Sequence, residues 1–318
     1  MKKAFVFPGQ GSQYVGMGLD LYEGYEAARA VFAEADETLG FPLSRLCFEG
    51  PEEALTDTAN AQPAIFTVSM AFFQVVKALA WEATPWAEPR DEAFLAGHSL
   101  GEYSAFVAAG ALNFPDALCL LRERGHLMKE AGSRAPGGMA AVLNLEKDAL
   151  EDICRQAQEQ TGGMVRIANY NSPTQLVISG DKEALARAME LAKERGARRV
   201  VPLAVSAAFH SPLMASIVEE FRRAVESTPV RAASIPVLAN ATATPLTEEK
   251  AIREEMVAQL TAPVRWVESV QYMIAQGVAE FVEIGPKDVL TGLIRRIDGQ
   301  VKTTNVGKVE ELKAFLGL

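Results

Sequence analysis

Short apolar runs alternate with amphipathic stretches through the first third of the chain. The runs KAFVF at 3–7 and AFLAG at 93–97 are followed by Pro or sit beside Gly, and both predict buried strands. Apolar positions recur at helical spacing in 25–40 and 114–132, and 63–80 is apolar on most faces of a helix. This alternation of strands and helices predicts a mostly parallel sheet with helices on both faces.

The order of elements changes between residues 135 and 205. A strand, a helix, two strands, a second helix and a last strand follow one another there, which is the βαββαβ order of a ferredoxin-like unit. Beyond this segment the alternating α/β pattern resumes. We therefore predict one catalytic core formed by residues 1–134 and 206–318, with residues 135–205 inserted as a small ferredoxin-like subdomain.

The motif GHSLGE at 97–102 carries the clearest chemical signal. It places Ser99 between two glycines, after a predicted strand and before a predicted helix, as in a G-x-S-x-G nucleophile elbow. The new helix directs its unpaired N–H groups toward the serine, where negative charge develops during acyl transfer. The alternative is a glycine-rich turn without chemistry, and the surrounding pattern favours a nucleophile.

A serine hydroxyl needs a base to accept its proton, and histidine is the usual base. The chain has three histidines. His210 lies in a loop before a helix that Ser211 is placed to cap, and we predict that it is the base. His98 is expected to pack or hydrogen-bond within the elbow as a supporting residue, and His126 lies on the next helix. Both remain alternatives, as does a purely capping role for the His210 loop.

Composition limits the function classes. A net charge of −10 argues against nucleic-acid binding, which depends on clustered Lys and Arg. Polar residues interrupt the apolar segment 64–81, which suits a buried helix better than a membrane span. Cys47, Cys119 and Cys154 lack the spacing of a disulfide framework or a metal site. A cytoplasmic protein without a metal is therefore expected, and the absence of heptads or of a long apolar stripe favours a monomer.

Two arginines follow the elbow, in the segment LLRERGH. A guanidinium beside an acyl-transfer site can pair bidentately with a carboxylate of the substrate. By composition alone, Arg122 and Arg124 are more typical of a solvated helix face than of a substrate site.

Taken together, these motifs resemble those of malonyl-CoA:acyl-carrier-protein transacylases, in the same order over nearly the whole chain. The family has a ferredoxin-like subdomain inserted in an α/β-hydrolase-like core. The resemblance implies transfer of a malonyl group from malonyl-CoA to acyl carrier protein for fatty-acid elongation, without a cofactor. The matching motifs are GQGSQ at 9–13, GHSLGE at 97–102, RG at 124–125, NYNSP at 169–173, FHS at 209–211 and the stretch 259–266.

The resemblance also implies a role for each matching residue. Ser99 would carry the malonyl ester, His210 would act as base and then as acid, and Arg124 would hold the malonyl carboxylate. Gln10 and the backbone N–H of Leu100 would form the oxyanion hole.

Other roles implied by the resemblance concern the walls of the site. The backbone carbonyl of Gln259 would orient the histidine. Asn169 and Asn171 would line the cleft, although asparagines beside Ser-Pro also suit a plain turn. Phe209 would favour malonyl over methylmalonyl, because its ring fills the space that an α-methyl needs. One methyl is worth about 1–3 kcal/mol, so a preference is expected rather than exclusion.

Carrier proteins of this family are acidic, which implies a basic docking rim on this acidic chain. One candidate cluster is Lys193, Arg195, Arg198 and Arg199, and a solvated helix end explains these charges equally well. Three other functions remain open: an acyltransferase that serves a polyketide synthase, a serine thioesterase or carboxylesterase, and a non-catalytic carrier-binding module. The last would be expected to lose the serine, arginine or histidine.

Overall fold

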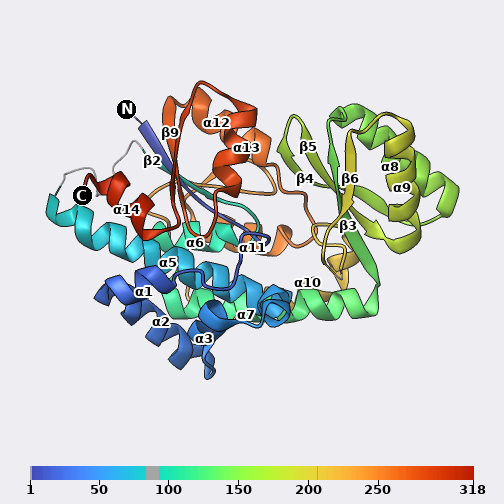
Figure 1. Ribbon diagram of the computed structural model, residues 1–318. Helices are drawn as coiled ribbons and strands as arrows, with labels where there is room; N and C mark the ends of the chain where they lie inside the picture. The colour runs from blue at the N-terminus through green and yellow to red at the C-terminus, as the bar shows by residue number, and fades with distance from the viewer. Residues whose placement is uncertain (1, 84–92, 206) are drawn as a thin grey trace.

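The computed structural model describes residues 2–83, 93–205 and 207–318 and contains two separate β-sheets (Figure 1). The larger sheet has the strand order β10-β9-β1-β2-β7-β8. Its neighbours pair in parallel, except that β8 runs antiparallel to β7. The chain is therefore an α/β protein whose larger sheet is mixed. The strands of the larger sheet are β1 (Lys2–Phe7), β2 (Ala93–Gly97), β7 (Val237–Leu238), β8 (Pro245–Leu246), β9 (Val278–Ile284) and β10 (Lys302–Val306).

Helices cover both faces of the larger sheet, as the alternating pattern predicts. In β1, Phe7 packs on the side of α5 and α7, whereas Ala4 and Val6 pack on the side of α12 and α13. Figure 1 shows these two helical layers below and above the sheet. The helices of this unit are α1 (Leu19–Gly24), α2 (Glu26–Leu39), α3 (Leu43–Glu49), α4 (Glu52–Thr56), α5 (Thr58–Ala83), α6 (Gly101–Ala108), α7 (Phe114–Arg134), α10 (Val218–Ser227), α11 (Glu249–Ala258), α12 (Trp266–Ala275), α13 (Val289–Ile297) and α14 (Val309–Leu316).

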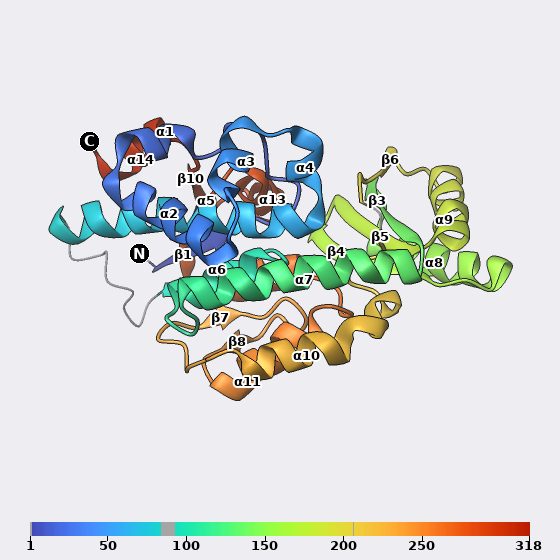
Figure 2. The ribbon, with the colours of Figure 1, turned by 90° about the horizontal axis from the view of Figure 1, so that it is seen from below.

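The smaller sheet forms a second unit beside the first, and its strand order is β4-β5-β3-β6 with all neighbours antiparallel. Figure 2 shows α7 running from beneath the core toward this unit. A backbone bridge between Asn169 and Val264 joins β4 to the core. The elements of the smaller unit are β3 (Gly137–Leu143), α8 (Lys147–Thr161), β4 (Val165–Ser172), β5 (Gln175–Asp181), α9 (Lys182–Glu194) and β6 (Arg199–Pro202).

Helix α5 departs most clearly from the sequence prediction, because it begins at Thr58 and continues through Pro63. A proline inside a helix has no N–H for the carbonyl four residues earlier. In this protein that carbonyl belongs to Ala59, and Nη1 of Arg122 on α7 donates to it at 2.6 Å. An interhelical hydrogen bond thus replaces the missing intrahelical one.

Local differences from the predicted elements are smaller. The segment after His210 begins as a 3₁₀ helix, η2 (Pro212–Ile217), before α10 continues it, and Ser211 caps η2 through its side chain. In the apolar run at 235–242, where the alternating pattern indicates a strand, only Val237–Leu238 is a strand. Three short helices near the N-terminus, α1, α3 and α4, had no clear periodicity because one or two turns are too short to show it.

Among the residues that the structure describes, one helix passes the length and hydropathy test for a membrane span. Residues 58–79 of α5 meet that test, and 72% of this window is buried inside the protein. Figure 2 shows α5 packed between α2 and α7. It is accordingly a core helix, as predicted for the segment 64–81.

Candidate active site

Ser99 lies at the sharp turn between β2 and α6. Its backbone adopts the left-handed conformation, with φ of 53°, which is strained for a residue other than glycine. The glycines on either side are needed for close approach. A Cβ on Gly97 would lie 1.9 Å from the carbonyl carbon of Gly101, and a Cβ on Gly101 would lie 2.2 Å from the carbonyl oxygen of Phe7. The motif is therefore a packed elbow that fixes the direction of the serine side chain.

His210 approaches Ser99 from the loop before η2. Its Nε2 lies 2.9 Å from Oγ of Ser99, and its Nδ1 lies 2.9 Å from the backbone carbonyl oxygen of Gln259. A carbonyl oxygen only accepts, so Nδ1 carries the proton and Nε2 is the acceptor. The serine hydroxyl can therefore donate to Nε2, as a general base requires.

Arg124 is buried beside the same hydroxyl, with 1% of its surface exposed. Its Nη2 donates to Oγ of Ser99 at 3.1 Å and to Oε1 of Gln259 at 2.8 Å, and its Nη1 donates to Oε1 of Gln62 at 2.6 Å. Its Nε is buried and has no hydrogen-bond partner. All of these acceptors are neutral oxygens. Composition alone suggests that Arg124 lies on a solvated helix face, and this interpretation is wrong because the side chain is buried.

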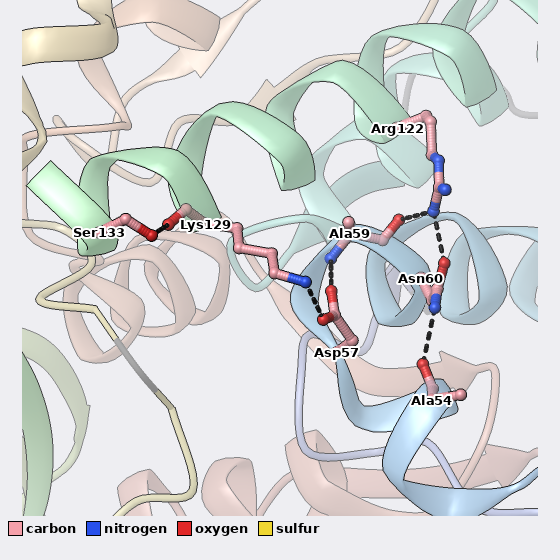
Figure 3. A network of polar contacts seen from close by, with 7 residues as sticks. All are labelled: Ala54, Asp57, Ala59, Asn60, Arg122, Lys129 and Ser133. Carbon is pink, nitrogen blue, oxygen red and sulfur yellow. Dashed lines mark hydrogen bonds and ion pairs between the residues drawn. The ribbon is translucent and has the colours of Figure 1, made fainter.

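Two side chains of α7 fasten it to the start of α5 and so hold this arginine in place (Figure 3). Arg122 contacts both the backbone of Ala59 and the side chain of Asn60. Five residues after the buried arginine, Lys129 forms an ion pair with Asp57. The helix that carries the guanidinium is thus anchored on both sides of it.

A cavity of about 310 Å³ opens at Ser99 and is lined by residues of both units. Gln10 and Leu100, the two residues predicted to form an oxyanion hole, lie in its wall. Oγ1 of Thr58 donates to Oε1 of Gln10 at 2.9 Å, which leaves the N–H groups of Gln10 as donors. Leu100 is the N-cap residue of α6, whose first N–H groups have no acceptor within the helix.

The small unit also contributes to the cavity wall through Asn169 and Asn171 on β4, and Phe209 of the core lies in the wall as well. His98 was expected to pack or hydrogen-bond within the elbow, but the contacts of its ring are with residues outside that turn. Its Nε2 is 2.8 Å from Oδ1 of Asn171 on β4, and its ring packs 5.9 Å from that of Trp266. His126 is not among the residues that line the cavity. Within the described ranges, no group of three or more His, Cys, Asp or Glu residues could hold a metal ion.

Comparison with known proteins identifies the family. A family model described as "Acyl transferase domain" matches residues 4–310. The "Malonyl CoA-acyl carrier protein transacylase" of Bacillus subtilis (strain 168) is 46% identical over 312 residues, which cover 98% of this chain and 95% of that protein. The chain belongs to the family of malonyl-CoA:acyl-carrier-protein transacylases.

Solved structures agree over the full length of this acyltransferase. The crystal structure of an acyl carrier protein S-malonyltransferase from Vibrio cholerae superposes with a TM-score of 0.92 at 42% identity, covering 99% of this chain and 100% of that one. A second structure is described as a type II PKS acyl-carrier protein in complex with its malonyl-transacylase. It has a TM-score of 0.93 at 38% identity and covers 100% of this chain and 99% of that one.

Three buried polar residues of this acyltransferase site were not predicted from the sequence. Gln62 contacts the arginine, and Asn240 accepts from the backbone N–H of Ser99 at 2.7 Å. Glu102 is the last residue of the quoted GHSLGE motif, yet no role was assigned to it. Asn240 could have been suspected, because it follows a core strand at the edge of the sheet where Ser99 also lies. Gln62 lies within an apolar helix and gives no such signal.

The electrostatics of the site favour a neutral histidine. Burial, and after it the guanidinium of Arg124, lower the pKa of His210 to about 3. The hydrogen bond to the Gln259 carbonyl acts in the opposite direction. The imidazole is therefore neutral near pH 7 and able to accept a proton. The unfolded chain binds this proton near pH 6.5, roughly the ordinary value. His210 therefore reduces stability as pH falls from that value toward 3.

We predict that Arg124→Met raises the pKa of His210, because it removes the positive charge that opposes protonation. An NMR titration of the imidazole signals measures this shift. Arg155→Met is the matched control, because it removes an exposed arginine of α8 that pairs with Asp152 and does not line the cavity, and it should leave the pKa of His210 unchanged. Titration of His210 at about 6.5 in the unmodified protein would contradict this electrostatic picture.

Proposed function

We propose that this acyltransferase moves the malonyl group of malonyl-CoA to the phosphopantetheine thiol of acyl carrier protein, for fatty-acid chain elongation. The observation that carries the proposal is the buried guanidinium of Arg124, 3.1 Å from Oγ of Ser99 and with an unpartnered Nε. A buried cation with only neutral partners favours an anionic ligand. An acyl group with a free carboxylate supplies that anion at the nucleophile.

The first half-reaction forms an ester on Ser99. Nε2 of His210 accepts the hydroxyl proton while Oγ attacks the thioester carbon of malonyl-CoA. The negative charge that develops on the carbonyl oxygen is stabilised by N–H groups of Leu100 and Gln10. The C–S bond then breaks, and the imidazolium returns its proton to the sulfur of coenzyme A. The carbonyl of Gln259 keeps the imidazole in the required tautomer throughout.

The second half-reaction repeats these steps with a different thiol. His210 accepts the proton of the phosphopantetheine thiol as its sulfur attacks the malonyl ester, and the ester oxygen leaves as the Ser99 hydroxyl. Arg124 holds the carboxylate through both halves, so the acyl group stays aligned with the nucleophile. Phe209, only 6% exposed in the cavity wall, limits space beside the α-carbon and favours malonyl over methylmalonyl.

The finer description of the fold is part of this proposal. We assign residues 1–134 and 206–318 to an α/β-hydrolase-like core and residues 135–205 to an inserted ferredoxin-like subdomain. The mostly parallel sheet around the elbow supports the first assignment, and the antiparallel order β4-β5-β3-β6 with two helices supports the second. We also expect a cytoplasmic monomer that needs no cofactor beyond its two substrates.

Hydrolysis is the rival chemistry, since a thioesterase or carboxylesterase shares the elbow and delivers the acyl group to water. The names of the curated relatives favour transfer, and so does a clamp that holds one class of acyl group. Among the contacts of the described residues, a backbone carbonyl occupies the place that a carboxylate has in hydrolase triads.

The direct test mixes the protein with labelled malonyl-CoA alone. One label per chain should appear on Ser99, and Ser99→Ala should acquire none, because the ester has no oxygen on which to form. Intact-protein mass spectrometry with peptide mapping measures both. Addition of acyl carrier protein should then move the label to the carrier rather than release malonate. A label on the Ser99→Ala variant, or release of free malonate as the main product, would show the proposal to be wrong.

We further propose that the acidic carrier protein docks on Lys193, Arg195, Arg198 and Arg199, all of which are exposed at the end of α9 and the start of β6. The chain continues from β6 to Leu203 in the cavity wall, which connects the cluster to the site. Replacing these four residues by Glu should slow transfer to the carrier and spare acylation by malonyl-CoA, since only the carrier contacts them.

Stopped reactions at several ionic strengths measure the two half-reactions separately, with fatty-acid and polyketide carrier proteins compared in parallel. Lys250→Glu on α11 is the control for a change of surface charge elsewhere. Equal slowing of both half-reactions by the four-residue variant would count against this docking surface.

A further inference from the structure

Glu102 is a fully buried carboxyl group on the first turn of α6, behind Ser99. One of its oxygens accepts from the backbone N–H of Asn240 at 2.7 Å and from Nδ2 of the same residue at 3.1 Å. Its other oxygen accepts from Nε2 of Gln259. No step of the mechanism above uses this group, although both of its partners contact the catalytic residues.

The first partner fixes the elbow. Nδ2 of Asn240 donates to both Glu102 and the carbonyl of Gly97, which leaves Oδ1 to accept from the N–H of Ser99 at 2.7 Å. A carboxamide turned the other way would place two donors face to face at Ser99. The carboxyl group thus determines which end of Asn240 meets the strained residue of the elbow.

The second partner connects three parts of the site. Nε2 of Gln259 donates to Glu102 and to the carbonyl of Ser99 at 3.0 Å, so its Oε1 is directed to Nη2 of Arg124 at 2.8 Å. The backbone carbonyl of the same residue accepts from Nδ1 of His210. The orientation of one side chain therefore affects the nucleophile and the carboxylate clamp, while its backbone holds the base.

A second carboxyl group completes the cluster. Glu255 is 5% exposed, accepts from the backbone N–H of Ala241 at 2.8 Å, and is hydrogen-bonded to Glu102. Burial and the nearby Glu255 raise the pKa of Glu102, which favours its protonated form, and burial raises the pKa of Glu255 as well.

We propose that Glu102 is a positioning residue for malonyl transfer, which acts through Asn240 and Gln259 to align the nucleophile with the carboxylate clamp. The inference rests on the proposed function. An acidic residue in the first turn of a helix ordinarily favours the start of that helix. The proposal gives Glu102, the last residue of the GHSLGE motif, a different task.

Glu102→Gln disturbs the contact with Gln259 and leaves the contacts with Asn240 and Glu255 in place. The new amide keeps an oxygen for both N–H groups of Asn240 and a donor for Glu255, but it presents a second donor to Nε2 of Gln259. If Gln259 turns to relieve this contact, its oxygen faces the carbonyl of Ser99 and its NH₂ faces Arg124. Either arrangement disturbs the nucleophile and the clamp together.

The experiment measures the rate of Ser99 malonylation in single turnovers over a range of malonyl-CoA concentrations. We expect Glu102→Gln to lower the saturating rate about 10²-fold, the usual cost of a small misalignment, and to raise the half-saturating concentration. Circular dichroism and thermal unfolding should show a folded protein. Glu280→Gln is the control, because Glu280 is a buried carboxylate whose partners, Lys3 and Lys302, lie at the sheet away from the site. It should acylate as the unmodified protein does.

Three outcomes would overturn the proposal: an unchanged rate in folded Glu102→Gln, a lower saturating rate without any rise in the half-saturating concentration, or an equal loss in the Glu280 control. Should Glu102→Gln fail to fold, Gln259→Leu replaces it, since this variant removes the amide and keeps the backbone carbonyl for His210. The same loss then supports the proposal, and an unchanged rate contradicts it. If the unmodified protein forms no malonyl ester, the proposed function fails instead, which separates the two results.

Discussion

The burial of one guanidinium is the constraint on which the rest of the site depends. Arg124 is removed from water and surrounded by neutral acceptors from Gln62, Gln259 and Ser99. Neutral dipoles compensate only part of the cost of burying a charge, and under the proposed function a ligand carboxylate would compensate the rest. The same charge adds to the effect of burial in keeping His210 unprotonated. In the proposed function, one side chain thus both selects the acyl group and helps to keep the base neutral.

The fold holds the guanidinium of Arg124 in a fixed position. Helix α7 is fastened to α5 on both sides of the arginine, partly through a carbonyl that Pro63 leaves free. On the other side, the buried carboxyl group of Glu102 accepts from Nε2 of Gln259, whose Oε1 accepts from Arg124. Gln259 therefore lies between Glu102 and Arg124. Fold stability and catalytic alignment therefore depend on the same hydrogen bonds.

The sequence predicted the parts of the site that local pattern determines. Ser99 was identified from its glycine-flanked elbow, and His210 from a loop beside a capped helix. The partners of these residues were harder to predict, because they come from segments far apart along the chain. Gln62 and Asn240 reach the site only after α5 packs on α7 and β7 pairs with β2. His98 was misjudged for the same reason, since its partner Asn171 belongs to the other unit.

The most direct test of the account compares acylation of Ser99 by malonyl-CoA and by acetyl-CoA in the unmodified protein and in Arg124→Ala. Loss of a buried charge partner costs about 3–5 kcal/mol, so malonylation should fall about 10²-fold or more. Acetylation should fall far less, because acetyl has no carboxylate for the arginine to hold. An equal loss for the two substrates would contradict the claim that Arg124 selects the acyl group.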